Sequence, residues 1–363
     1  MNYIKGFDGL RCYSILLVVV THLGIAHQFE EGSYLRDHLF YFFSGPAGVN
    51  IFFAISGFLI TTLILNEIKT TGTFKVKLFF YRRFLRLLPP IIPFYLALYI
   101  FMQLGYVRET TIGLLASVFY LFNFVPRAKI SWSPELSHTW SLAVEEQFYI
   151  FWAIIFKFFN THKRNILIFL ILFLCVLGFY FLPTIPLTIK GKDYLLEEVF
   201  FVDRWVIPAV APILLGALFA QLNFSNYRQI RERFKGNLAG YFSLLVFFSP
   251  LYLPEFLMPW VKIFHGLGST FLLLWVFNNQ ERGIIRVLEW APIKYIGVIS
   301  YGVYIWQGFF VRTGPNGTPK IWVHDFPYNV VLTFIVAILS YELYEKKVLR
   351  LKKRFKSTAV KQA

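Results

Sequence analysis

The chain has 363 residues, of which 57% are hydrophobic and 15% are charged, and its formal net charge is +16 at pH 7. A soluble domain of this length cannot bury so much apolar surface, so the composition excludes an ordinary soluble protein and predicts a lipid-facing surface. The basic residues lie in short clusters between apolar segments, a pattern typical of membrane topology that argues against nucleic-acid binding.

Apolar segments of about 20 residues, the length of a helix that crosses a bilayer, recur along the chain. They predict an all-α fold, a polytopic membrane helix bundle with about ten transmembrane helices. The predicted spans lie near residues 11–27, 45–65, 87–105, 139–159, 165–182, 203–222, 238–254, 262–278, 295–312 and 328–346. A further segment, 111–124, is apolar but short, so its length leaves open whether it crosses the membrane.

The basic connections favour one topology, because Lys and Arg near span ends prefer the cytoplasmic side. If 111–124 does not cross, the strongly basic connections all fall on one side, and 106–138 is a long outer connection that dips into the membrane or lies on it. Both termini then face the cytoplasm. We therefore expect a multi-pass protein of the cytoplasmic (inner) membrane, with a transmembrane domain over 1–346 and a basic cytoplasmic tail over 347–363 that contacts anionic lipid.

The first span carries two ionisable residues, Arg11 and His22, in an apolar environment that tolerates neither without a partner. Eleven residues correspond to 1100° of helix, about 20° from a whole number of turns, so both side chains share one face about 16.5 Å apart along the axis. This face carries a fixed cation at one level and a titratable base at another. A histidine that simply bonds to a neighbouring helix is the alternative.

The second span, Gly48–Ile60, contains small residues that allow close helix packing, and its Ser56 can form a hydrogen bond. The sequence FYRRFLRLLPP follows on the inner side, where Arg83 and Arg86 are three residues apart and Arg82 points elsewhere. Arginine at all three positions suits a bidentate contact with phosphate or carboxylate. A topological anchor and an anion site both remain open.

The segment SHTWSLAVEEQFYIFW begins another span at its outer end. Glu145 lies seven residues after His138, about two turns away on nearly the same face. The adjacent Glu145 and Glu146 are not expected to face the same neighbour, so at least one of them should point into the bundle or meet a partner.

Arg204 follows Asp203 at the start of a later span, where a simple ion pair and a substrate contact are both open. The two cysteines, Cys12 and Cys175, lie inside apolar stretches. They are expected to be packing residues, and the sequence predicts no metal site.

Seven segments in this order resemble the acyltransferase 3 family of membrane O-acyltransferases, which acylate cell-envelope or exported carbohydrates. They are FDGLRCYSILLVVVTH, GVNIFFAISGFLI, RRFLRLLPP, HTWSLAVEEQFYIFW, DRWVIPAVAPILLGALFA, IGVISYGVYIWQ and LSYELYEKK. The resemblance extends over nearly all of the chain. It implies a ten-span bundle with a cytoplasmic N-terminus, which agrees with the topology expected from charge.

The resemblance implies that His22 is the catalytic base and Arg11 its essential partner. It also implies that Arg83 and Arg86 are the family's cytoplasmic arginine pair, which receives the acyl donor.

Two positions depart from the family pattern. Asn50 stands where the family usually has aspartate, and Gln307 stands where it usually has histidine. Residue 307 therefore cannot supply an acid or a base.

These observations together predict an O-acyltransferase, most simply an O-acetyltransferase. It would move an acyl group from acyl-coenzyme A, a donor substrate rather than a bound cofactor, to a hydroxyl of a surface or exported polysaccharide or a lipid-linked sugar. The candidate residues are His22, Arg11 and Glu145 for catalysis, Arg82, Arg83, Arg86 and Ser56 for the donor, and His138, Trp140 and Arg204 for the acceptor. An acyl-enzyme on His22 or Ser56 stays open, and a transporter or flippase is the alternative function.

Overall fold

The computed structural model describes residues 3–24, 29–30, 33, 44–107, 111–130, 134–311 and 322–351. In chain order its helices are α1 (Phe7–His22), α3 (Gly45–Thr71), α4 (Val76–Gln103), α5 (Thr111–Val118), α6 (Arg127–Ile130), α7 (Thr139–Phe158), α8 (Thr161–Phe181), α9 (Leu196–Val199), α10 (Val206–Ala209), α11 (Ala211–Ser225), α12 (Tyr227–Arg233), α13 (Asn237–Phe248), α14 (Val261–Asn278), α15 (Gly283–Leu288), α16 (Ala291–Phe310), α17 (Tyr328–Ser340) and α18 (Lys346–Leu351). A π-helical turn, Tyr341–Glu345, joins α17 to α18.

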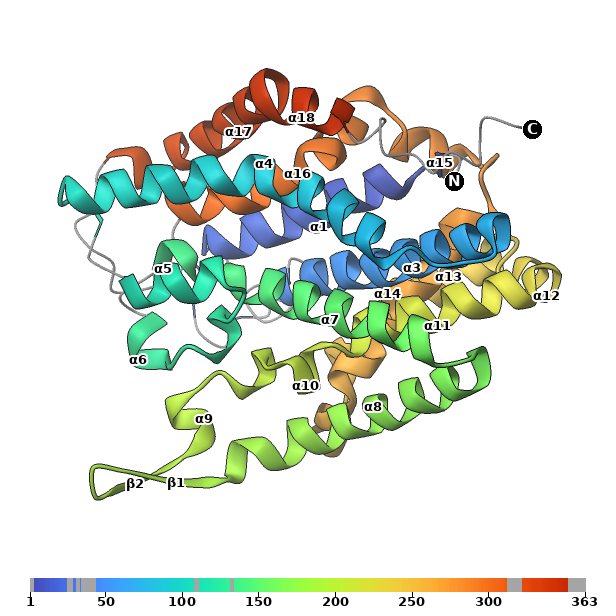
Figure 1. Ribbon diagram of the computed structural model, residues 1–363, viewed down its shortest axis with the longest axis horizontal. Coiled ribbons are helices and arrows are strands. Elements are labelled where there is room, and N and C mark those ends of the chain that lie inside the picture. Colours follow the sequence, from blue (N-terminus) through green and yellow to red (C-terminus); the bar gives the residue numbers. More distant parts are fainter. Residues whose placement is uncertain are drawn as a thin grey trace.

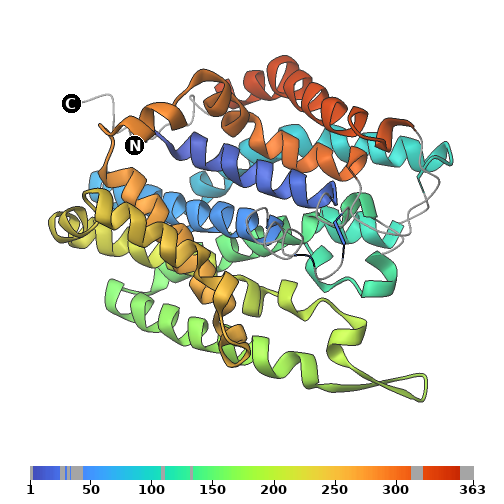
Figure 2. The same ribbon diagram turned by 180° about the vertical axis from the view of Figure 1, so that it is seen from behind.

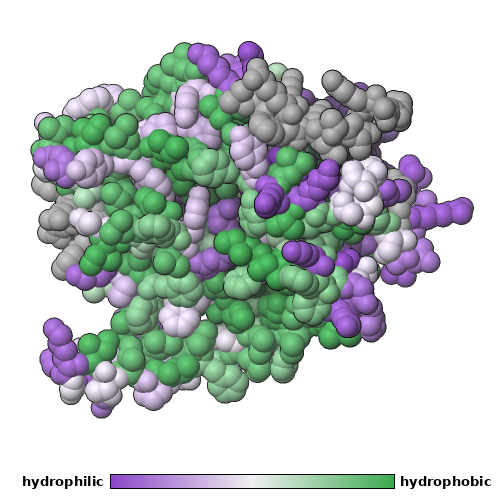
Figure 3. Space-filling view, viewed as in Figure 1, coloured by the Kyte–Doolittle hydropathy of each residue, from purple (hydrophilic) through white to green (hydrophobic). Residues whose placement is uncertain are grey.

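The molecule has the surface of a membrane protein. Within the described ranges, five helical segments are long and apolar enough to cross a membrane: Gly45–Thr71, Val76–Gln103, Thr161–Thr184, Phe256–Asn278 and Tyr328–Arg350. Hydrophobic residues cover the middle of the face in Figure 3, and hydrophilic ones gather toward its ends. The predicted all-α membrane architecture is confirmed, whereas the count of ten spans and the cytoplasmic termini stay predictions.

The long helices lie side by side and run between two ends of the molecule (Figures 1 and 2). The connections from α3 to α4 and from α7 to α8, together with α12 and α15, lie at the same end as the start of α1. The segment 111–124 forms no long helix: α5 ends at Val118, and a 3₁₀ turn, Phe122–Phe124, follows. Because α5 and α6 lie at the opposite end, the chain returns between α4 and α7 without crossing the bundle there.

Some element boundaries differ from those expected. The helix predicted from residue 87 begins at Val76 and continues through Pro89, Pro90 and Pro93, so the arginine-rich segment lies inside α4. The span expected at 203–222 is interrupted: a 3₁₀ turn, Val202–Arg204, precedes α10 and α11.

A short antiparallel hairpin, β1 (Pro186–Ile189) with β2 (Lys192–Leu195), was not expected in an all-α chain. It extends beyond the end of α8 at the edge of the molecule (Figure 1). Residues 352–363, most of the predicted basic tail, lie outside the described residues, so the tail stays a prediction.

Glycines allow the central helices to approach closely. A Cβ added to Gly57 of α3 would lie 1.9 Å from the Ile213 carbonyl oxygen of α11, and one added to Gly297 of α16 would lie 1.8 Å from the Asp8 carbonyl oxygen of α1. No side chain fits at such distances, so these contacts require glycine. The Gly297 contact holds α1 directly against α16, which brings the polar residues of the two helices together.

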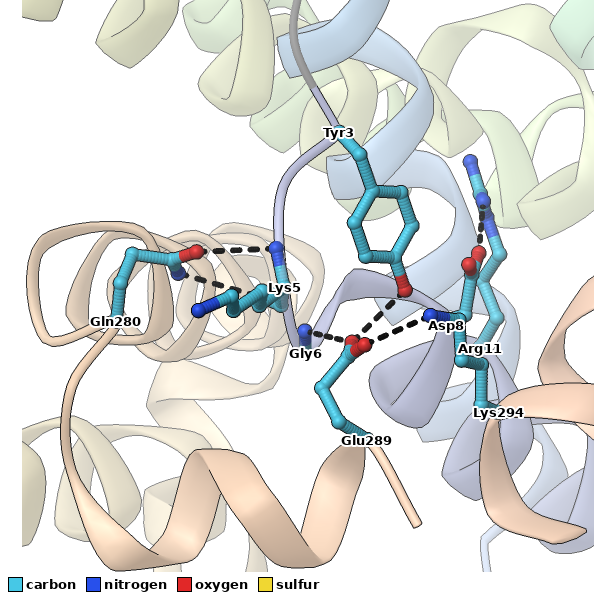
Figure 4. A network of polar contacts seen from close by, with 8 residues as sticks. All are labelled: Tyr3, Lys5, Gly6, Asp8, Arg11, Gln280, Glu289 and Lys294. Atoms are coloured by element: carbon cyan, nitrogen blue, oxygen red, sulfur yellow. Dashed lines mark hydrogen bonds and ion pairs between the residues drawn. The ribbon is translucent and has the colours of Figure 1, made fainter. Parts of the chain in front are cut away.

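The start of α1 is held by the segment between α15 and α16 (Figure 4). One oxygen of the Glu289 carboxylate accepts hydrogen bonds from the Gly6 N–H at 2.6 Å and the Tyr3 hydroxyl at 2.8 Å, and the other pairs with Lys294 Nζ at 2.9 Å. Burial opposes ionisation of Glu289, but the bonds from Gly6, Lys294 and Tyr3 outweigh it and lower the pKa of the carboxyl below its ordinary value.

Replacing Glu289 with glutamine is therefore expected to lower the thermal unfolding midpoint in detergent at neutral pH, by about 1 to 3 °C. A carboxyl with a lowered pKa stabilises the folded state above its ordinary pKa of about 4.3, and this contribution is lost as the pH falls through the lower folded value. Melting curves of both proteins from pH 7 down to the acid limit provide the measurement. A difference that stays constant across this range would contradict the assignment.

Candidate active site

The polar residues inside the bundle form two clusters. The histidine cluster comprises His22, His138, Trp140, Arg204, Tyr304 and Gln307. The arginine cluster comprises Arg11, Ser56, Arg83, Arg86, Glu145, Glu146 and Tyr149. The histidine cluster lies where α1 and α16 end and α7 begins. In the arginine cluster, Arg11 lies near the start of α1, and Glu145, Glu146 and Tyr149 lie near the middle of α7.

His22 occupies the last turn of α1 and contacts α16. Its Nδ1 lies 2.9 Å from Oε1 of Gln307, which is 1% exposed. Because an amide oxygen only accepts hydrogen bonds, Nδ1–H must donate, and the lone pair of the neutral imidazole then resides on Nε2. Gln307 cannot titrate, as expected, but it selects the tautomer in which Nε2 is the base.

His138 lies at the start of α7 and is 2% exposed. Its backbone carbonyl accepts a 2.8 Å hydrogen bond from the Tyr304 hydroxyl, and its ring packs edge-on against Tyr304 and Phe94. The Glu135 backbone lies within hydrogen-bonding reach of the ring, and the ring lies within electrostatic range of His22. The ring nitrogen that does not face Glu135 can bond to a substrate.

Arg204 and Trp140 complete the histidine cluster. The Arg204 guanidinium carbon lies 5.5 Å from the Trp140 ring centroid, and Arg204 is within electrostatic range of His22. Asp203 lies within electrostatic range of Arg204, but no ion pair among the described residues joins the two. The three predicted acceptor residues thus gather around the predicted base.

Glu145, a predicted catalytic residue, belongs to the arginine cluster and not to the histidine cluster that contains the predicted base. Its carboxylate accepts hydrogen bonds from Ser56 and Tyr149, and one oxygen lies 3.5 Å from Arg83. Glu146 also reaches Arg83, at 3.6 Å, so the expectation that adjacent glutamates face different neighbours is wrong. The long Arg83 side chain comes from a separate helix, α4, and so meets both carboxylates at once.

Arg86 has an exposed side chain and lies within electrostatic range of Arg11 and Arg83. Arg11 pairs with Asp8 at 2.7 Å, whereas no ion pair within the described ranges involves Arg86. Arg86 therefore differs from Arg11 and Arg83 in having no carboxylate partner among the described residues.

Arg82 does not join the other two arginines of its motif. It pairs with Glu67 of α3 at 2.5 Å. The expected donor residues Arg83, Arg86 and Ser56 therefore come together, and Arg82 faces a different neighbour.

Three residues of the site were missed in the sequence. Tyr149 lies four residues after Glu145, on the same helix face, and this spacing was an available signal. Tyr304 and Gly308 carried no comparable signal, because their importance depends on His138, which comes from another helix. A Cβ added to Gly308 would lie 2.1 Å from Cε1 of the His138 ring.

No group of three or more His, Cys, Asp or Glu residues in the described part of the chain could hold a metal ion. Cys12 and Cys175 are both buried and free.

The chain is similar to bacterial O-acetyltransferases over almost its whole length. It is 27% identical to a putative O-acetyltransferase of Staphylococcus aureus (strain COL), covering 95% of this chain and 57% of that protein. It is 25% identical to a peptidoglycan O-acetyltransferase of Listeria monocytogenes, covering 95% and 55%, and 27% identical to a putative peptidoglycan O-acetyltransferase of Bacillus subtilis, covering 96% and 55%. The chain thus spans little more than half the length of these relatives.

No solved structure gives a significant match to the chain. The family model described as the acyltransferase domain matches residues 4–345, in agreement with the seven sequence segments that resemble this family. The chain therefore belongs to the acyltransferase 3 family.

Proposed function

We propose that the protein is a membrane O-acyltransferase that moves an acyl group, most simply acetyl, from acyl-coenzyme A to a hydroxyl of a cell-envelope glycan. The names of the relatives support the reaction and the class of acceptor. The observation that carries the proposal is the contact between His22 and Gln307. This contact leaves Nε2 of the His22 imidazole as a base within the histidine cluster.

The proposed step is direct transfer. Nε2 of His22 removes the proton from the acceptor hydroxyl as the hydroxyl oxygen attacks the thioester carbonyl. A C–O bond forms, the C–S bond breaks, and the proton passes from His22 to the departing thiolate. Trp140 offers a flat surface for the sugar ring, and the buried His138 ring bonds to its hydroxyls.

The donor would bind at the arginine cluster. Exposed Arg86 contacts phosphate groups of coenzyme A, and Arg11 and Arg83 add positive potential. From there the pantetheine arm extends along α1 toward His22, over the roughly 16.5 Å that separate residues 11 and 22 along the helix axis.

The test compares envelope glycan from cells with and without this protein by mass spectrometry. The proposal expects a mass increase of one acyl group on a sugar residue, and fragmentation locates the acylated hydroxyl. The proposal would be wrong if the glycan mass were unchanged and the purified protein moved glycan across vesicle membranes. The protein would then be a transporter.

Replacing Arg86 with lysine is expected to raise KM for the acyl donor by about tenfold with little change in kcat, because the charge is kept and the bidentate contact is lost. Arg228→Lys is the matched control, since Arg228 is an exposed arginine on α12 at the same end of the bundle. Steady-state kinetics with varied acyl-coenzyme A provide the measurement. Equal donor KM values for Arg86→Lys and Arg228→Lys would show that Arg86 does not bind the donor and serves only membrane topology.

A further inference from the structure

Arg204, at the edge of the histidine cluster, lies near two other cationic side chains and one carboxylate. Arg127 of α6, Arg204 of the turn Val202–Arg204 and Lys262 of α14 come from three separate elements. Arg204 lies within electrostatic range of Arg127, Lys262 and Asp203, and Lys262 within range of Asp203. We call these three cations the cationic cluster.

The two arginines share one aromatic ring. The guanidinium carbon of Arg127 lies 4.1 Å from the Phe201 ring centroid, and that of Arg204 lies 4.0 Å from it. Arg127 Nε also donates a 3.2 Å hydrogen bond to the Phe200 carbonyl oxygen. Stacking on Phe201 holds both guanidinium groups in place and leaves most of their N–H groups without a carboxylate.

The charges of this cluster are not balanced by described residues. Asp203 supplies one negative charge against three positive charges, and no ion pair in the described part of the chain involves any of the four residues. Arg204 and Lys262 are half-buried. Holding like charges together in a partly desolvated environment costs free energy, and a bound anion offsets that cost.

The cationic cluster is continuous with the candidate active site. Arg204 belongs to both, since its guanidinium lies over Trp140 and within electrostatic range of His22. One acceptor molecule can therefore reach both sites, with an anionic group between Arg127, Arg204 and Lys262 and a hydroxyl at His22.

We propose that the cationic cluster binds the anionic group, a carboxylate or a phosphate, of an acidic glycan acceptor while a nearby hydroxyl of the same glycan meets His22. This inference rests on the proposed function and names its substrate class. Guanidinium groups suit both anions, because each offers paired N–H donors to two oxygens.

The experiment uses purified protein in lipid vesicles, acetyl-coenzyme A and three acceptors. A neutral oligomer of N-acetylglucosamine carries no charge, an oligomer that alternates N-acetylglucosamine with N-acetylmuramic acid carries carboxylates, and a phosphodiester-linked N-acetylglucosamine oligomer carries phosphates. Acetyl transfer and equilibrium binding are both measured for each acceptor.

The variants Arg127→Gln and Lys262→Gln are expected to raise KM for a charged acceptor by about tenfold or more and to leave KM for the neutral one nearly unchanged. Asp203→Asn should act in the opposite direction and lower KM for the charged acceptor, which a merely structural role does not predict. Lys192→Gln is the matched control, because it removes an exposed cation from the hairpin at the same end of the molecule.

The charged acceptor affected by Lys262→Gln and Arg127→Gln identifies the anion as carboxylate or phosphate. Equal losses with neutral and charged acceptors, or no preference of the unmodified protein for either charged acceptor, would overturn the inference. If no glycan is acetylated but a charged oligomer still binds, and binds less well to Lys262→Gln, the proposed function is wrong but the anion site is supported.

Discussion

Replacing His22 with alanine is expected to reduce acyl transfer by about 10²- to 10⁴-fold, the usual contribution of a general base. The imidazole is the titratable group that Gln307 orients, and alanine leaves the acceptor hydroxyl without a base. Loss of kcat with little change in donor KM is the expected pattern, because the arginine cluster is untouched. Initial rates at matched protein levels in vesicles provide the measurement.

His162→Ala is the control for this experiment. His162 lies exposed in the first turn of α8, on a different helix from His22. Its replacement should leave the rate unchanged. Full activity of His22→Ala would show that the assigned base is wrong, whatever the behaviour of the control.

Gly308→Ala is expected to impair use of the acceptor and to spare donor binding. The added methyl group would lie 2.1 Å from the His138 ring and 2.4 Å from the Glu135 carbonyl oxygen, so the ring must move or α16 must shift. Strain of this kind costs about 1 to 3 kcal/mol. A rise in acceptor KM together with an unchanged donor KM would match a displaced His138.

Gly302→Ala, on the same helix, is the matched control. The nearest atom to its added Cβ is Glu345 Oε1 at 3.4 Å, an ordinary van der Waals distance, so this variant should keep both KM values. Its thermal midpoint should be equal or higher, because alanine favours helix by about 1 kcal/mol over glycine. If Gly308→Ala and Gly302→Ala have the same acceptor KM, the close packing of residue 308 against His138 does not affect acceptor binding.

The limits of the long helices follow from local sequence. Predicted spans 45–65, 139–159 and 262–278 correspond closely to α3, α7 and α14, because continuous apolar length and flanking charge are properties of the segment itself. The length of the segment 111–124 left its crossing open, and the structure forms only the short helix α5 and a 3₁₀ turn there. The prediction differs in α4, where the arginine-rich segment before residue 87 was placed outside the span but continues the same helix from Val76.

The sequence by itself determined a membrane-embedded helical bundle, its family and the face of the first helix that carries Arg11 and His22. Only the tertiary structure decided which residues meet: Gln307 with His22, both glutamates with Arg83, and two arginines on the Phe201 ring. The physical reason is that these helices are apolar on most sides, so periodicity does not fix their rotation about their own axes. Rotation and neighbours are set instead by close contacts such as Gly297 against Asp8, which join residues far apart in the chain.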